Sequence, residues 1–109
     1  MHQAPAQFRQ GDVFLVPIAG PAGVATSTEV PRDAGRVVLA YGEVTGHAHA
    51  IADDAATLWV DGDDVRRLVV EAEVFLRHEE HATIAVPPGA YEVRIQREYS
   101  PAGIVRVAD

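Results

Sequence analysis

The feature that most constrains this chain is a rhythm of short β-branched and aromatic runs, broken by turn residues about every ten positions. Such runs favour strands, because these side chains fit a pleated, half-buried surface. Glycine and proline between the runs supply the φ angles that turns need. The runs are Asp12–Ile18, Arg36–Tyr41, Thr57–Val60, Leu68–Leu76, Thr83–Val86, Tyr91–Tyr99 and Ile104–Val107. This spacing predicts an all-β fold, a small barrel or a sandwich.

The length of the chain predicts a single domain. A chain of 109 residues, 48% of them hydrophobic, can close one core and is too short for two ordinary domains. We therefore expect one domain over residues 1–109, with residues 1–10 frayed and the Pro-, Gly- and Ser-rich segment 20–35 as a mobile excursion. One short helix is an alternative over Glu71–Glu80, which is rich in good helix formers.

Charge and composition exclude several classes of function. The net charge of −7 and the absence of lysine oppose binding to nucleic acid or anionic lipid, which relies on neutralising phosphates. No secretory signal and no apolar run long enough to span a membrane occur in the sequence, so the cytoplasm is the expected location. Without cysteine, a metal must be held by nitrogen and oxygen ligands.

The stretch GEVTGHAHAI, at 42–51, contains a pair of histidines that can chelate a metal. On an extended strand, His47, His49 and Ile51 point to the same face. The Cα atoms of the two histidines would lie about 6.5 to 7 Å apart, from which two rings can converge on one ion. A buried imidazole must satisfy both ring nitrogens, and a shared cation is one way to do so.

The stretch RHEEHATI, at 77–84, supplies a second pair of histidines. His78 continues the inward alternation of Val74 and Leu76. If a turn follows, His81 could face the same mouth, and on a helix the i, i+3 spacing would also put both on one face. With His47 and His49, this pair reaches the ligand count of a zinc, iron, nickel or manganese site. The alternative is that the four histidines are polar core and turn residues.

Two segments, GHAHAIAD and PPGAYE, resemble the metal motifs of the cupin superfamily, which run His-x-His then Glu, and later Pro-x-Gly-x-x-His. The resemblance implies a double-stranded β-helix, with His47 and His49 as ligands. By position it also implies Asp53 and Glu92, which stand where the family has Glu and His. The strings QGDV and HEEH are similar to those of small uncharacterised bacterial proteins, which implies no function.

Two functions from different classes are compatible with these residues. In the first, a divalent metal with an open coordination position acts on a small substrate, with Glu79 or Glu80 as acid or base. In the second, the protein is a non-catalytic module that assembles into a symmetric homo-oligomer, and the histidines stabilise the fold or the interface. Three protein ligands in a pocket would favour catalysis, and four would favour structure.

Three residues near the end of the longest predicted strand are candidates for orienting a substrate. Arg94, Arg97 and Tyr99 could hold an acidic molecule above the metal, because arginine grips a carboxylate with two hydrogen bonds. A structural ion pair with Glu92 or Glu98 is the alternative for these arginines.

Overall fold

The structure is a computed structural model that describes residues 7–19, 27–42, 46–100 and 103–106, with side chains up to residue 96. All strand pairings in it are antiparallel. The all-β prediction is confirmed, and the described residues contain no helix, including over Glu71–Glu80. No helix in this part of the chain is therefore long and apolar enough to cross a membrane.

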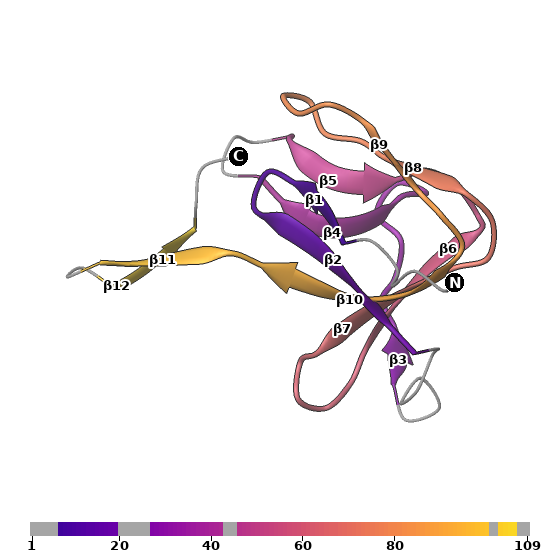
Figure 1. Cartoon of the computed structure of the whole chain (residues 1–109), viewed down its shortest axis with the longest axis horizontal. Helices are drawn as coiled ribbons and strands as arrows, with labels where there is room; N and C mark the ends of the chain where they lie inside the picture. The colour runs from indigo at the N-terminus through magenta and orange to yellow at the C-terminus, as the bar shows by residue number, and fades with distance from the viewer. Residues whose placement is uncertain (1–6, 20–26, 43–45, 101–102, 107–109) are drawn as a thin grey trace, which may run out of the picture.

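The first sheet has six strands in the order β1-β2-β10-β7-β6-β3 (Figure 1). Its strands are β1 (Phe8–Gln10), β2 (Val13–Ile18), β10 (Gly89–Ile95), β7 (Arg66–Val70), β6 (Ala56–Val60) and β3 (Thr28–Glu29). The β1–β2 hairpin turns on Gly11, whose φ of 57° favours glycine. The sheet does not close on itself among the described strands, so it forms no barrel.

The second layer consists of two hairpins joined side by side. One pairs β4 (Val37–Tyr41) with β5 (Ala48–Ile51), and the other pairs β8 (Val74–Leu76) with β9 (Ile84–Val86). An isolated antiparallel bridge between Ala50 and Arg77 links β5 to the end of β8. A further hairpin, β11 (Arg97–Ser100) with β12 (Gly103–Arg106), follows β10.

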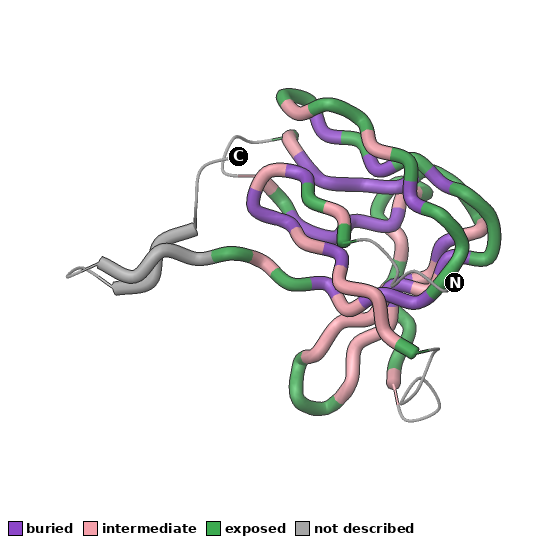
Figure 2. Tube along the Cα trace, viewed as in Figure 1, coloured by how far each residue is buried: buried purple, intermediate pink, exposed green. Residues whose placement is uncertain are grey.

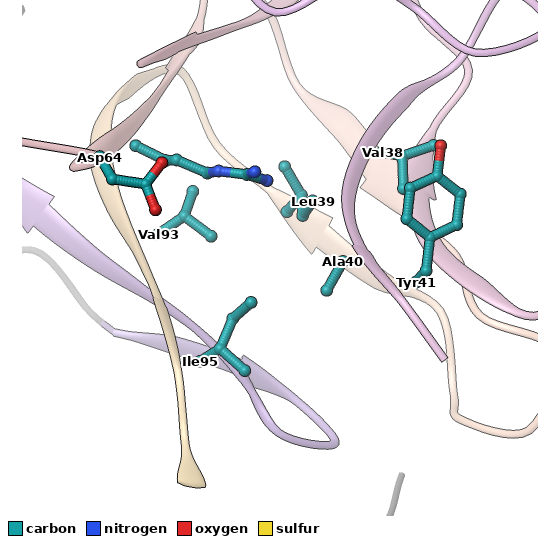
Figure 3. Close-up of a pocket in the computed structure, with 8 residues that line it drawn as sticks. Val38, Leu39, Ala40, Tyr41, Asp64, Val93 and Ile95 are labelled. Atoms are coloured by element: carbon teal, nitrogen blue, oxygen red, sulfur yellow. The ribbon is translucent and has the colours of Figure 1, made fainter. Parts of the chain in front are cut away.

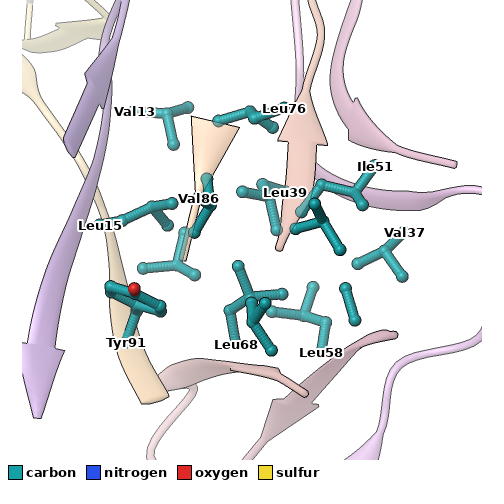
Figure 4. Packing of buried hydrophobic residues seen from close by; sticks show 14 of the residues in the cluster. Val13, Leu15, Val37, Leu39, Ile51, Leu58, Leu68, Leu76, Val86 and Tyr91 are labelled. Atoms are coloured by element: carbon teal, nitrogen blue, oxygen red, sulfur yellow. The ribbon is translucent and has the colours of Figure 1, made fainter. Parts of the chain in front are cut away.

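The main hydrophobic core lies between these two layers, as Figure 4 shows. Leu15, Leu58 and Leu68 come from the six-stranded sheet, and Leu39 and Leu76 come from the second layer. Each of the five side chains is at most 1% exposed. Complete burial of one such side chain stabilises the fold by about 1.5 to 3 kcal/mol, so this core is the main force that holds the layers together.

Strand β5 is buried along its whole length (Figure 2). His49 and Ile51 face the main core, whereas Ala48 and Ala50 pack on the other face with Val38 in a second, smaller cluster. The outer face of β5 therefore carries only alanine side chains.

Two long predicted strands are in fact each divided. The run Leu68–Leu76 leaves the first sheet after β7, bends through exposed residues 71–73, and enters the second layer as β8. The run Tyr91–Tyr99 is likewise split into β10 and β11. Crossing between layers needs a bend, and the alternation of apolar residues continues through it, so the sequence pattern alone does not reveal it.

Parts of both segments expected to be frayed or mobile are strands. Phe8–Gln10 forms β1, and Gln10 is only 3% exposed, so the structure places this part of residues 1–10 in a paired strand. Within 20–35, Thr28–Glu29 forms β3, paired with β6. The remainder of these two predictions falls largely on residues 1–6 and 20–26, which lie outside the described residues.

Candidate metal centre

The register between β5 and β8 positions the histidines. The bridge has two backbone hydrogen bonds, from Ala50 N to Arg77 O (3.0 Å) and from Arg77 N to Ala50 O (2.9 Å). In an antiparallel pair, each step along one strand is a step back along the other. Extending this register places three further pairs opposite each other: His49 with His78, Ala48 with Glu79, and His47 with Glu80.

Four imidazole rings gather where these strands end. The ring centroids of His49 and His78 are 4.3 Å apart, and those of His78 and His81 are 4.8 Å apart. His47 lies 5.8 Å from His78, edge to face, and His81 lies 6.0 Å from His49. The bend at 79–81 allows His78 and His81 to meet, in the way that the turn hypothesis requires.

His49 is fully buried, and both of its ring nitrogens face protein groups. Gln10 donates its amide hydrogens to the carbonyls of Leu76 (2.9 Å) and Ala82 (3.0 Å). Its Oε1 must therefore accept from His49 Nδ1, at 2.8 Å. The other nitrogen, Nε2, lies 3.4 Å from Oδ1 of the buried Asp12. These contacts turn His49 toward the interior.

A different set of residues could hold a metal at the rim of the cluster. His47, His78 and Glu79 each offer one ligand atom, and the three atoms all lie within 4.8 Å of one another. His78 is buried, His47 is half-buried and Glu79 is exposed. The group therefore combines two imidazoles with one carboxylate at a place that solvent reaches.

Glu79 is held in place by the end of β5. Its Oε1 accepts a hydrogen bond from Ala48 N at 2.9 Å. If β8 continued in the same register, the backbone carbonyl of Glu79 would accept this bond instead. This hydrogen bond is the main cause that lowers the pKa of Glu79, with smaller contributions from its own backbone N–H and from His47 and His78. Glu79 is therefore an ionised carboxylate at neutral pH, which suits a metal ligand better than a proton donor.

The ring of His78 is oriented by the following turn. Glu80 N donates a hydrogen bond to His78 Nδ1 at 3.0 Å. In a neutral imidazole only one nitrogen has a free lone pair, so the proton of this ring is on Nε2. A metal bound at Nδ1 would replace the Glu80 amide as the partner of that nitrogen. A metal bound at Nε2 would require the proton to be on Nδ1, where it would face the N–H of Glu80 and break that hydrogen bond. Metal binding by His78 therefore requires the turn to rearrange.

The other predicted site residues lie away from this group. Asp53 follows β5 at the end opposite to His47, and its Oδ1 accepts from Ala55 N at 2.8 Å within its own turn. Glu92 is on β10 in the other sheet, where it forms an ion pair of 2.6 Å with Arg94. The structural alternative for Arg94 is thus the observed one. The side chains of Arg97 and Tyr99 lie outside the described residues.

Gln10 and Asp12 were not predicted from the sequence, although both contact His49. No metal or catalytic motif marks them. The available signal was a pair of polar residues around Gly11, directly before an apolar strand, which is typical of a tight hairpin turn. The pattern indicates the turn but does not show that the turn is tucked against β9 and the histidines.

A separate cavity lies away from the histidines. It has a volume of about 400 Å³ and opens between β4 and β10, with Leu39 and Ala40 on one side and Val93 and Ile95 on the other (Figure 3). Among the described residues that line it there is no histidine, and Asp64 is the one carboxylate. Its lining also includes Tyr41 and Arg66, so it mixes polar and apolar groups and offers no imidazole ligand in the part of the chain that the structure describes.

Fold and site together define a two-layered antiparallel β protein with an imidazole cluster at one end. The chain belongs to the family described as "Domain of unknown function (DUF8820)", whose model matches residues 9–96. The family that matches is thus not a cupin family. Searches of curated proteins and of solved structures gave no match.

Proposed function

We propose that this protein binds one divalent transition-metal ion through His47, His78 and Glu79. The observation that carries the proposal is the approach of three ligand atoms from these residues to within 4.8 Å of one another. Two imidazoles and one carboxylate are a ligand set found in catalytic zinc sites and in non-haem iron sites. Zinc, iron, nickel and manganese are all compatible with this set.

The exposure of the group supports a metal with an open coordination position. The side chain of His47 is 24% exposed, and Glu79 lies at the surface. Three protein ligands leave at least one position for water or substrate, which is the arrangement of catalytic metal sites. Glu80, whose Oε2 lies 4.0 Å from His47 Nδ1 and is not needed as a ligand, is the better of the two candidate acids or bases.

Whether the proposed metal site is catalytic or structural depends on whether His81 is a ligand. Its Nε2 is buried and has no hydrogen-bond partner among the described residues. Because metal binding by His78 rearranges the turn that contains His81, this nitrogen could become a fourth ligand. The His81→Gln variant tests this: retained zinc affinity favours three ligands and an open position, and a large loss favours a closed, structural site.

Metal content is the direct test of the proposal. Zinc, nickel and manganese are each titrated into metal-free protein by calorimetry, and elemental analysis measures the metal retained. We expect one zinc per chain, with binding lost in His47→Ala and Glu79→Gln. Glu73→Gln removes an exposed acid from the preceding bend and is the matched control. Absence of zinc binding in the wild type, or equal binding by all variants, would rule out the site.

The cupin resemblance contributes less to the proposal than the register does. It points to His47 and His49, and only His47 belongs to the proposed ligand set. A double-stranded β-helix would place the metal inside the fold, whereas this group lies at the rim of the second layer. Cytoplasmic location and assembly into a homo-oligomer stay predictions, and light scattering after gel filtration tests the latter.

A further inference from the structure

The outer face of the second layer carries a trough floored by alanine. Ala48, Ala50 and Ala52 alternate along β5 and its extension, so their methyl groups point away from the main core. The neighbouring strands carry larger side chains on this face. A cavity of about 260 Å³ follows the trough, lined by these alanines together with Arg36, Arg77, His78 and Glu79.

Two arginines flank the trough from opposite sides. The β4–β5 register pairs Val37 with Ile51, which places Arg36 opposite Ala52. The bridge to β8 places Arg77 opposite Ala50, across the trough. Both arginines line the same cavity, in which Ala52 is exposed and Ala48 and Ala50 are almost covered.

Neither of these arginines forms an ion pair with a carboxylate among the described residues. The side chains of Arg36 and Arg77 make no hydrogen bond or ion pair within the described part of the chain. Arg67 and Arg94, by contrast, are paired with Asp61 and Glu92. Arg36 does lie near Tyr41, because its positive charge acts to lower the pKa of that hydroxyl. Two guanidinium groups without a carboxylate partner, beside small apolar side chains, are suited to a ligand that has a negative charge and a small hydrocarbon part.

The trough leads to the proposed metal ligands. Glu79 stands opposite Ala48, and both His78 and Glu79 line the cavity. From Ala52 to Ala48 the chain advances four residues, about 13 Å in a strand. A molecule of this length or less could contact an arginine at one end and reach the metal at the other.

We infer that this trough binds a small organic anion, with its carboxylate held by Arg36 and Arg77 and its other end directed to the metal group. As the substrate pocket of that metal, the trough rests on the proposed function. As an anion site, it stands on the two arginines and the alanine floor. In this proposal Arg36 and Arg77 have the substrate-orienting role for which the sequence offers Arg94, Arg97 and Tyr99 as candidates.

Succinate is the probe, titrated into ¹⁵N-labelled protein that is metal-free or zinc-loaded, with the neutral succinamide as a control ligand. We expect succinate, and not succinamide, to shift the amide signals of Ala48, Ala50 and Ala52. Arg36→Gln and Arg77→Gln should each weaken binding about tenfold, because a hydrogen bond to a charged group is lost. Arg94→Gln removes the same charge from the other sheet and should leave binding unchanged.

The outcomes separate this inference from the proposed function. Arginine-dependent binding to metal-free protein that takes up no zinc would support the trough and refute the metal site. Zinc binding without succinate shifts in the trough would support the metal site and overturn the inference. Equal weakening by Arg94→Gln, or binding unaffected by Arg36→Gln and Arg77→Gln, would also overturn it.

Discussion

His49 and His78 pack with their rings 4.3 Å apart, yet they serve different regions of the molecule. His49 lies in an interior network, where Gln10 and Asp12 face its two nitrogens. His78 lies at the rim, where one nitrogen accepts a bond from a turn and the ring adjoins an exposed carboxylate. The difference shows that the contacts of an imidazole are set by the groups that surround it in the folded chain, here Gln10 and Asp12 for His49 and the 79–81 bend for His78, and not by the histidine motif alone.

The largest expected difference between the two regions is in stability. His49→Ala removes one member of a fully buried polar network and leaves Asp12 and Gln10 facing a cavity, so we expect a loss of about 3 to 5 kcal/mol in the free energy of unfolding. His47→Ala, at the rim, should change it by no more than about 0.5 kcal/mol. Urea denaturation measures both. Equal losses would show that interior and rim form one structural unit.

Metal should stabilise the protein through the rim alone. Free zinc at about 100 times its dissociation constant should raise the free energy of unfolding by about 2.7 kcal/mol, because only the folded chain presents the site. The corresponding rise in melting temperature is about 10 °C or more.

The control for the zinc effect is Glu79→Gln, in which the rise should be absent, whereas Glu73→Gln should show it in full. Differential scanning calorimetry measures all three proteins. If zinc stabilises Glu79→Gln as much as the wild type, Glu79 is not a ligand. The interior histidines would then be the candidate ligands, and the proposed difference between rim and interior would be wrong.

A smaller effect concerns the turn that joins rim to interior. Since zinc binding by His78 displaces the Glu80 amide, that amide should exchange with deuterium several-fold faster in the zinc-loaded protein, in line with the loss of about 1 kcal/mol of hydrogen bonding. The Gln10 side-chain amide should keep its rate. Unchanged exchange at Glu80 would mean that His78 is not a ligand.

The smallest expected effect is the pH dependence at Glu79. Its folded-state pKa lies below the ordinary value of 4.5, so its contribution to stability is present above that value and is lost as pH falls through the lower, folded-state pKa. The difference in free energy of unfolding between the wild type and Glu79→Gln should therefore disappear as the pH falls below the folded-state pKa of Glu79. The difference for His49→Ala should persist there, because packing and the Gln10 contact are lost at any pH. Denaturation curves between about pH 7 and pH 2.5 test this.

Much of the secondary structure could be predicted because alternation is a local property. The inward direction of Val74, Leu76 and His78 follows from period two alone, and all three are buried. The division of Leu68–Leu76 between two sheets could not be predicted in this way. That division depends on which layer each half joins, and hence on residues distant in the sequence.

The site follows the same rule. The sequence predicts that His47 and His49 share a strand face, and it supplies His78 and His81 as candidates. It does not reveal that Gln10, from the N-terminal hairpin, accepts a hydrogen bond from His49, because that contact joins residues 39 positions apart. The bridge at Ala50 and Arg77, which brings Glu79 to the histidines, is likewise a property of the folded chain.

The irregular register of β4 has a consequence for how this protein behaves in a crowded solution. The pairing with β5 shifts between Val38 and Ala40, and Leu39 and Ala40 both enter the main core. Of the outermost strands described in the two layers, β4 is the longest, and β1, β3 and β9 have three residues or fewer. An edge strand of that length exposes unpaired backbone N–H and C=O groups, with which a strand of another chain can pair. A β-bulge twists the edge and makes such pairing less favourable. We therefore expect the extra residue to hinder edge-to-edge pairing of β4 with another chain.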